Sequence, residues 1–230
     1  MMDSIYLFPI ALALLALSAR SLDFKGALTA MIMGLAVLGS QDLYWLSLLL
    51  VFFVVGTMAT KVKAEHKKQF GLYQKIRSTE NVIGNGGMAL LMALLGNFYG
   101  FAGALSTATA DTLSSELGIL SKKKPRLITS FKRVKTGTDG AVSALGTAAE
   151  IGGVLIICVF IFIFNYYGAL AGIDLWKVLT ITFLSGLFGC TIDSVLGATI
   201  ERKGIFDNAK TNFVATLSGA AFAVLLSTVL

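Results

Sequence analysis

The chain has few charged residues, a single histidine and two cysteines, and each shortage excludes a kind of protein or site. Charged residues make up 14% of its 230 residues, whereas a soluble domain carries about 25%. The one histidine, His66, lies in a lysine-rich loop, and neither a histidine-based triad nor a zinc site is expected around it. Cys158 and Cys190 lie in apolar segments without a CxxC motif, which excludes a disulfide framework. The sequence also lacks a Walker A motif, a Rossmann fingerprint and a nucleic-acid-binding module.

Apolar residues make up 56% of the chain and fall into eight separate blocks. The blocks have about 15–25 residues each, close to the length that crosses about 30 Å of hydrocarbon as a helix. The sequence therefore predicts an all-α polytopic membrane protein, with about eight (seven to nine) helices and short loops in a single transmembrane domain over residues 1–230. A re-entrant pair over 82–117 is an alternative. The blocks are residues 4–19, 26–40, 43–60, 82–96, 98–117, 143–167, 174–197 and 211–230.

The basic residues predict the orientation in the membrane. Of the 19 lysines and arginines, 18 fall in four segments that share one side when the predicted helices alternate: residues 20–25, 61–80, 118–142 and 198–211. The positive-inside rule places that side in the cytoplasm and both termini outside. Residues 61–80 form a cytoplasmic loop, which is either an ordinary topology signal or a basic amphipathic stretch at the membrane interface.

Carboxylates inside membrane helices are costly and mark function by default. In the sequence TATADTLSSELG, Thr107, Asp111 and Ser115 share one helix face, because residues four apart stack along a helix. Glu116 points about 140° away from Asp111 on a regular helix, so either it has a separate role or the helix is broken near it. A divalent cation is a natural partner for this cluster, with small-residue packing as the alternative. Glu150, in the sixth block, either holds a loop lysine or makes an inter-helix contact.

Further polar residues lie near the predicted cytoplasmic ends of other helices. Asp193 has no capping position to explain it, and it is interpreted as a ligand for a metal or a polar headgroup. The pairs Asn81–Asn85 and Asn208–Asn212 each lie one turn apart at a helix start. For these two pairs, helix capping is the alternative to binding a phosphate or a headgroup.

The segment 118–142 is predicted to be a cytoplasmic nucleotide-binding loop. Its lysines and arginines supply charge for a triphosphate, and glycines flank Thr and Asp in the GTDG turn before the next helix. Backbone N–H groups in such a turn can converge on phosphate. A basic loop with a helix cap is the alternative. The candidate phosphate ligands are Lys122, Arg126, Lys132, Arg133, Lys135, Thr136, Gly137, Thr138 and Gly140, joined by Asn81 and Asn85.

Five stretches together resemble the DUF92 membrane proteins, also called the TMEM19 family: NGGMALLMAL, GALSTATADTLSSELG, PRLITSFKRVKTGTDGAVSALGT, DSVLGATIE and NAKTNFVATLSGA. The resemblance covers residues 20–230. That family includes the plant phytyl-phosphate kinase and many archaeal and bacterial members, and the brevity of this chain resembles a prokaryotic, archaeal member. A more distant similarity connects the chain to phytol and dolichol kinases, and it implies the use of CTP and a divalent metal. The residues that carry it are, in order, Asp111, Gly118, Pro125, Lys135–Thr136 and Asp139–Gly140.

These observations lead to the hypothesis of an isoprenyl-phosphate kinase that uses CTP or another nucleoside triphosphate. It would transfer a phosphoryl group to a membrane-embedded prenyl monophosphate and give the diphosphate. The expected partners are the nucleotide, the isoprenyl phosphate lipid and the membrane, without nucleic acid, and a homodimer is left open. The active site would face the cytoplasm from the cell membrane of a prokaryote. The alternatives are a transporter of an ion or an anionic isoprenoid lipid, a CTP-dependent cytidylyltransferase and a prenol kinase.

The hypothesis gives each candidate residue a role. Mg²⁺ would be the cofactor, and the candidate catalytic residues are Asp111, Asp139 and Glu116. The expected metal ligands are Asp111, Asp193, Glu116 and Ser115, and the expected contacts of the substrate headgroup are Thr107, Asn208 and Asn212.

Overall fold

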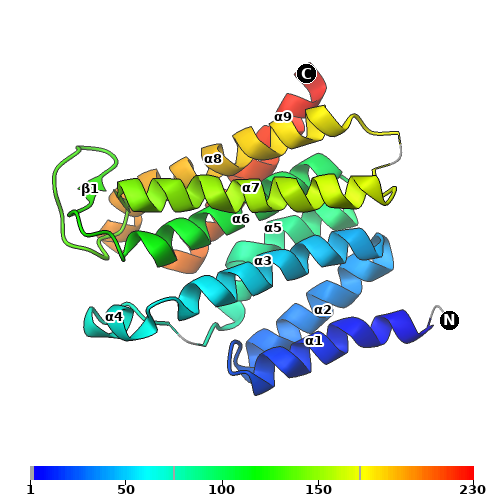
Figure 1. Cartoon of the computed structure of the whole chain (residues 1–230), viewed down its shortest axis with the longest axis horizontal. Coiled ribbons are helices and arrows are strands. Elements are labelled where there is room, and N and C mark those ends of the chain that lie inside the picture. Colours follow the sequence, from blue (N-terminus) through cyan, green and yellow to red (C-terminus); the bar gives the residue numbers. More distant parts are fainter. Residues whose placement is uncertain (1–2, 75, 171) are drawn as a thin grey trace.

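In the computed structural model the chain is mostly helical (Figure 1). The structure describes residues 3–74, 76–170 and 172–230, so Met1, Met2, Ala171 and Lys75, the last within the basic segment 61–80, lie outside the described residues. Eight helices overlap the eight predicted apolar blocks, and the short α4 is additional. The helices are α1 (Leu7–Ser18), α2 (Phe24–Ser40), α3 (Leu43–Lys61), α4 (Ala64–Gln69), α5 (Thr79–Leu94), α6 (Phe98–Gly118), α7 (Ala144–Tyr166), α8 (Leu175–Thr199) and α9 (Asn208–Val229).

Two further kinds of short element accompany them, 3-10 helices and a pair of strands. The 3-10 helix η1 (Asp3–Tyr6) precedes α1, and η2 (Glu201–Lys203) follows α8. Between α6 and α7 the chain forms a small antiparallel pair of strands, β1 (Arg126–Leu127) and β2 (Ala141–Val142), in which Arg126 pairs with Val142. The predicted loop 118–142 is therefore a folded hairpin with a fixed register.

Helix α6 lies at the centre of the bundle. It packs against α3, α5, α7, α8 and α9, and all its residues from Gly100 to Ala110 are buried. Small side chains permit this packing: a Cβ added at Gly153 of α7 would lie 2.9 Å from the Cα atom of Ala110. Close approach of backbones through small residues is the usual way in which helices associate in lipid.

By length and composition, four helical segments among the described residues can cross a membrane: α3, α7, the segment Leu175–Lys203 and α9. The helices α1 and α2 are apolar but shorter. The central helix α6 is less apolar, which fits its position, because its neighbours rather than lipid cover its surface. These findings bear out the prediction of a helical membrane protein.

Side-chain caps set the starts of most helices. An acceptor oxygen on the residue before each of these helices binds a free backbone N–H of the first turn. The residues whose side chains do so are Asp23, Asp42, Ser78, Asn97, Ser143, Asp174 and Asp207. Asn81 takes part in the capping box of α5, because it accepts a hydrogen bond from the Ser78 backbone N–H. The capping alternative therefore accounts for Asn81, and Asp207 rather than Asn208 caps α9.

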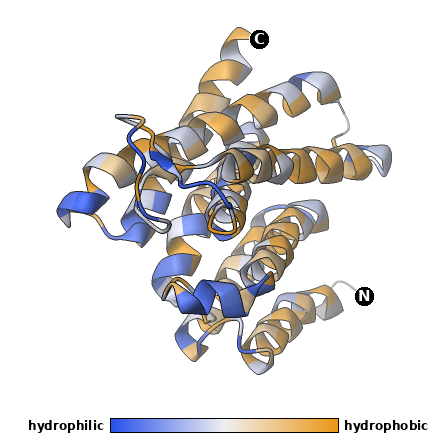
Figure 2. Ribbon diagram, turned by 60° about the vertical axis from the view of Figure 1, so that its left-hand side comes forward, coloured by the Kyte–Doolittle hydropathy of each residue, from blue (hydrophilic) through white to orange (hydrophobic). Residues whose placement is uncertain are grey.

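Hydrophilic residues gather at one end of the bundle (Figure 2). The helix α4 and the hairpin β1–β2 lie at this end, and the start of α1 lies at the opposite end (Figure 1). We call the end with α4 and the hairpin the polar end. The segment 118–142, with most of the candidate phosphate ligands, includes this hairpin.

Candidate functional site

Two aspartates from different helices come together near the polar end. Asp111 of α6 and Asp193 of α8 are both partly buried, and their carboxyl groups lie within hydrogen-bonding reach of each other. Ser115, one turn beyond Asp111, donates a long hydrogen bond to it from Oγ (3.5 Å). Three of the predicted metal ligands, Asp111, Ser115 and Asp193, therefore lie together in the fold. Asp111 and Asp193 are more than 80 positions apart in the sequence.

Two asparagines from further helices complete this cluster. When its amide is oriented to satisfy its neighbours, the buried Asn212 of α9 donates from Nδ2 to Asp193 Oδ1 (3.2 Å) and to the Asn208 carbonyl (3.1 Å). Its Oδ1 then accepts from Nδ2 of the buried Asn85 in α5 (3.2 Å). Helices α5, α6, α8 and α9 thus each bring one polar side chain to the same point, which we call the acidic cluster (Asp111, Asp193, Asn85 and Asn212).

The acidic cluster offers two carboxylates from different helices as possible oxygen ligands. Two carboxylates in contact repel each other when both are ionised, and a cation between them removes this cost. Among the described residues, no three His, Cys, Asp or Glu side chains form a set that could hold a metal by themselves. Mg²⁺ usually needs only one or two carboxylates, with phosphates and waters completing its shell. The donor set therefore suits Mg²⁺ brought with a polyphosphate.

The GTDG turn packs directly onto the helix that carries Asp193. A Cβ added at Gly197, one turn beyond Asp193, would lie 2.7 Å from the backbone N of Gly140. Gly137 and Gly140 have φ angles of +83° and +69°, which glycine adopts without strain. Asp139, between them, is exposed. Gly140 thus packs against Gly197 and Ala198 of α8 and holds the predicted phosphate loop near Asp193, whereas Gly137 packs against Leu72.

A basic cavity of about 570 Å³ lies beside this turn. Its polar lining combines residues of the hairpin segment with one residue of η2: Lys124, Arg133, Lys135, Thr138 and Arg202. Cavities of about 300–1,000 Å³ are typical of small-molecule sites, and four cationic side chains match a polyphosphate. Arg133, Lys135 and Thr138 are predicted ligands, whereas Lys124 and Arg202 were not among the candidates.

The other predicted ligands of this segment lie outside the cavity lining. Lys122 and Lys132 are exposed, and Arg126 donates from Nη1 to the Phe131 carbonyl (2.8 Å). Thr136 is partly exposed. The hairpin therefore divides its basic residues between the cavity and its own outer surface.

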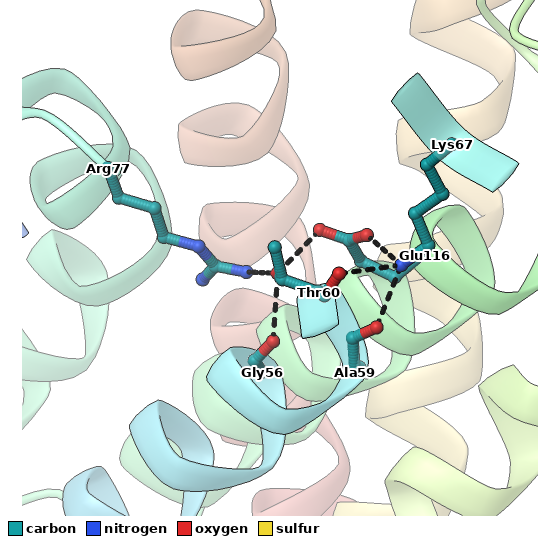
Figure 3. A network of polar contacts seen from close by, with 6 residues as sticks. All are labelled: Gly56, Ala59, Thr60, Lys67, Arg77 and Glu116. Carbon is teal, nitrogen blue, oxygen red and sulfur yellow. Dashed lines mark hydrogen bonds and ion pairs between the residues drawn. The ribbon is translucent and has the colours of Figure 1, made fainter. Parts of the chain in front are cut away.

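Glu116 has a role separate from the acidic cluster (Figure 3). Helix α6 continues unbroken to Gly118, so Glu116 points away from Asp111 as a regular helix requires. Its Oε2 lies 2.6 Å from Nζ of the fully buried Lys67, and its Oε1 accepts a hydrogen bond from Thr60 Oγ1 (2.6 Å). The structure brings Glu116 to the basic segment 61–80 rather than to Asp193.

Lys67 and Arg77 converge on the same network. Lys67 Nζ also donates to the carbonyls of Ala59 (2.8 Å) and Thr60 (3.1 Å). Arg77 donates from Nη2 to Thr60 Oγ1 (3.3 Å). Neither cation was a candidate, because in the sequence they belong to a run of basic residues that is typical of a solvated loop. Only the contacts of its side chain with the ends of α3 and α6 distinguish Lys67 from its neighbours.

Three remaining candidates lie apart from the acidic cluster or at its edge. Thr107 is fully buried, and its hydroxyl donates to the carbonyls of Gly103 (2.9 Å) and Ser185 (3.2 Å). It therefore serves the packing of α6 on α8. Asn208 is exposed and reaches the cluster only through its carbonyl. Glu150 lies beside Cys190 of α8, which is an inter-helix contact.

The fold and the acidic cluster together define a mostly helical integral membrane protein with a polar site at one end of its bundle. The chain belongs to the family described as Integral membrane protein DUF92, which matches residues 7–220. The family resemblance seen in the sequence motifs is thereby confirmed.

Several relatives are similar to this chain over most of its length. A protein of the archaeon Methanocaldococcus jannaschii, Uncharacterized membrane protein MJ0933, is 38% identical over 221 residues, covering 94% of this chain and 90% of its own. Protein PGR of Arabidopsis thaliana is 31% identical, covering 80% of this chain and 74% of its own. Protein VTE6, chloroplastic, of the same plant is 27% identical, covering 91% of this chain and 66% of its own. No solved structure matches the chain.

Proposed function

We propose that this protein transfers a phosphoryl group from a nucleoside triphosphate, CTP by the family resemblance, to an isoprenyl monophosphate dissolved in the membrane. The observation that carries the proposal is the contact between the GTDG turn and α8 at Gly197, one turn from Asp193. It sets a basic cavity of polyphosphate size beside a pair of carboxylates suited to Mg²⁺. A soluble anion and a metal would meet there at the polar end of a membrane bundle.

Each group of residues has a part in this reaction. Arg133, Lys135 and Arg202 would neutralise the triphosphate, and the GTDG backbone would hold its phosphates. Asp111 and Asp193 would hold Mg²⁺, which supplies charge neutralisation at the transferring phosphoryl group. Asn85 and Asn212 orient Asp193 through the hydrogen bonds of the cluster. Positioning and charge neutralisation then account for most of the catalysis.

The bond changes balance without an added base when the acceptor is a monophosphate. An oxygen of the acceptor phosphate attacks the γ-phosphorus, the bond from the γ-phosphorus to the bridging oxygen breaks, and CDP leaves. A phosphate is already an anionic nucleophile, so the reaction requires no general base. A free prenol would need one, and the exposed Asp139 is the candidate for that role.

The orientation is part of the proposal. With all eight apolar helices crossing the bilayer, the polar end faces the cytoplasm and both termini lie outside. The nucleotide would then reach the basic cavity from the cytoplasm, and the lipid would reach the acidic cluster from within the bilayer. A cell membrane of a prokaryote is the proposed location.

Purified protein in detergent or lipid, given Mg²⁺, CTP and geranylgeranyl or phytyl monophosphate, tests the proposal. We expect the isoprenyl diphosphate and CDP in equal amounts. Release of pyrophosphate with a CDP-lipid would instead assign a cytidylyltransferase, and product from the alcohol alone would assign a prenol kinase. If no product forms with CTP, UTP, GTP or ATP and with either kind of acceptor, the kinase proposal is wrong. The transporter alternative would then remain.

A further inference from the structure

A second depression lies on the other side of the acidic cluster, between α1, α2, α3 and α5. Fifteen of its seventeen lining residues are apolar, among them Leu12, Ala30 and Phe53. The two polar lining residues are Arg77 and Asn81. We call this depression the apolar groove. Its outer wall is α1, which packs mainly against α2.

Arg77 is held rigidly by its backbone while its side chain keeps free donors. Its backbone N–H donates to the Ser21 carbonyl (3.0 Å), and its carbonyl accepts from the Asp23 N–H (3.1 Å). The guanidinium has five donors, and its one hydrogen bond within the described part of the chain is that to Thr60 at 3.3 Å. No carboxylate among the described residues forms an ion pair with it. Burial lowers the pKa of Arg77, although the charges of Glu116 and Asp111 oppose this.

The polar residues of the groove adjoin the acidic cluster by two routes. A Cβ added at Gly56 would lie 3.3 Å from Thr112 Cγ2 and 3.4 Å from Arg77 Nη1, which puts the guanidinium beside the residue that follows Asp111. On the other side, the Asn81 carbonyl accepts a hydrogen bond from Asn85 Nδ2 (3.0 Å). Groove and cluster are therefore neighbours across α5 and α6.

This arrangement has the polarity of an isoprenyl phosphate. The chain of such a lipid needs an apolar surface, and its headgroup needs a cation with free N–H donors. A planar guanidinium suits the oxygens of a phosphate monoester better than an ammonium does. An ordinary membrane phospholipid would cover the apolar walls equally well, but its phosphodiester carries less negative charge for a cation beside Thr112 than a phosphate monoester does.

We propose, on the basis of the function proposed above, that the apolar groove binds the isoprenyl chain of the acceptor and that Arg77 binds its monophosphate. The substrate would then enter between α1 and α3 from the bilayer. Its phosphate would lie between the groove and Asp111, on the opposite side from the basic cavity. Arg77 is thus a substrate-binding residue, and the groove sets the preferred chain.

Photolabelling tests the groove without requiring turnover. The probe is a geranylgeranyl monophosphate with a diazirine near the end of its chain, incorporated in nanodiscs with the full-length protein. We expect labelled peptides from α1, α2 and α3, with labelling suppressed by unlabelled geranylgeranyl monophosphate and unaffected by added phosphatidylglycerol. Labelling that added phosphatidylglycerol suppresses equally, or that is spread over all lipid-facing helices, would assign the groove to bulk lipid and overturn the proposal.

Two pairs of variants locate the chain and the phosphate separately. Ala30→Phe narrows the groove, and Ala221→Phe adds the same side chain on the exposed face of α9. We expect Ala30→Phe to reduce specific labelling about tenfold and Ala221→Phe to leave it unchanged, where a tenfold change in affinity is about 1.4 kcal/mol. Arg77→Gln should weaken competition by geranylgeranyl monophosphate but not by geranylgeraniol, and Arg77→Lys should restore part of it. Equal effects of the two phenylalanine variants would contradict the proposal that the apolar groove binds the isoprenyl chain.

The outcomes separate this inference from the proposed function. Specific labelling of the groove without phosphoryl transfer from any nucleotide would support the isoprenyl site in the groove and contradict the kinase activity. Phosphoryl transfer without specific labelling of α1, α2 or α3 would support the kinase activity and contradict the isoprenyl site in the groove.

Discussion

Lys67 Nζ lies 2.6 Å from Glu116 Oε2, with the lysine side chain fully buried. An ammonium has three donors, and here all three are used, because the carbonyls of Ala59 and Thr60 accept the other two. A buried ion pair is tolerated only when such further hydrogen bonds complete it. The pair fixes α4 against the polar ends of α3 and α6, next to Arg77.

Removing one partner of this pair should destabilise the protein. Lys67→Met leaves the Glu116 carboxylate without its cation, and loss of one member of a buried pair costs about 3–5 kcal/mol. We expect a clearly lower midpoint of thermal unfolding in detergent. Lys68→Met is the matched control, since the neighbouring Lys68–Glu65 pair is exposed on both sides and should change the midpoint little. Equal midpoints for the two variants would show that the buried pair does not stabilise the fold.

Asp111→Asn and Asp193→Asn should each abolish phosphoryl transfer without unfolding the protein. Each removes one of the two charges proposed to hold Mg²⁺, and loss of a main electrostatic group lowers turnover by about a hundredfold or more. The control is Asp174→Asn at the start of α8, because asparagine caps a helix as well as aspartate does. Initial rates over a range of Mg²⁺ concentrations measure the effect. Near-normal rates for Asp111→Asn would remove this residue from the metal site.

The contact between the hairpin and α8 can be tested with glycines alone. Gly197→Ala would place a methyl group 2.7 Å from the Gly140 backbone N and push the GTDG turn away from α8. We expect kcat/KM to fall by about ten- to a hundredfold, since small misplacements of positioned groups are costly. Gly152→Ala in α7 meets nothing within 4 Å and should leave kcat/KM unchanged. An unaffected Gly197→Ala enzyme would show that the turn does not act from this position.

Local sequence patterns predicted the positions of the helices well. The features that these patterns did not predict depend on contacts between distant segments of the chain. Apolar blocks such as 143–167 match α7 (Ala144–Tyr166) within one residue, because hydrocarbon length constrains each span by itself. Asp111 and Asp193 were recognisable because a membrane carboxylate is costly. The contact of Asn85 with Asn212, 127 positions apart, depends on how α5 packs on α9. Lys67 is buried for the same kind of reason, and its sequence neighbourhood resembles any basic loop.

Arg202 joins the basic cavity from η2, far in sequence from the hairpin that forms the rest of its lining. Its removal should weaken nucleotide binding more than removal of its neighbour Lys203, which is exposed and outside the lining. We expect Arg202→Gln to raise the KM for CTP by about threefold to fivefold, as an exposed charge contact contributes modestly, and Lys203→Gln to leave it unchanged. The difference should shrink at high ionic strength, because salt screens exposed charges. Steady-state kinetics at low and high salt measure both effects, and equal KM values for the two variants would exclude Arg202 from the nucleotide site.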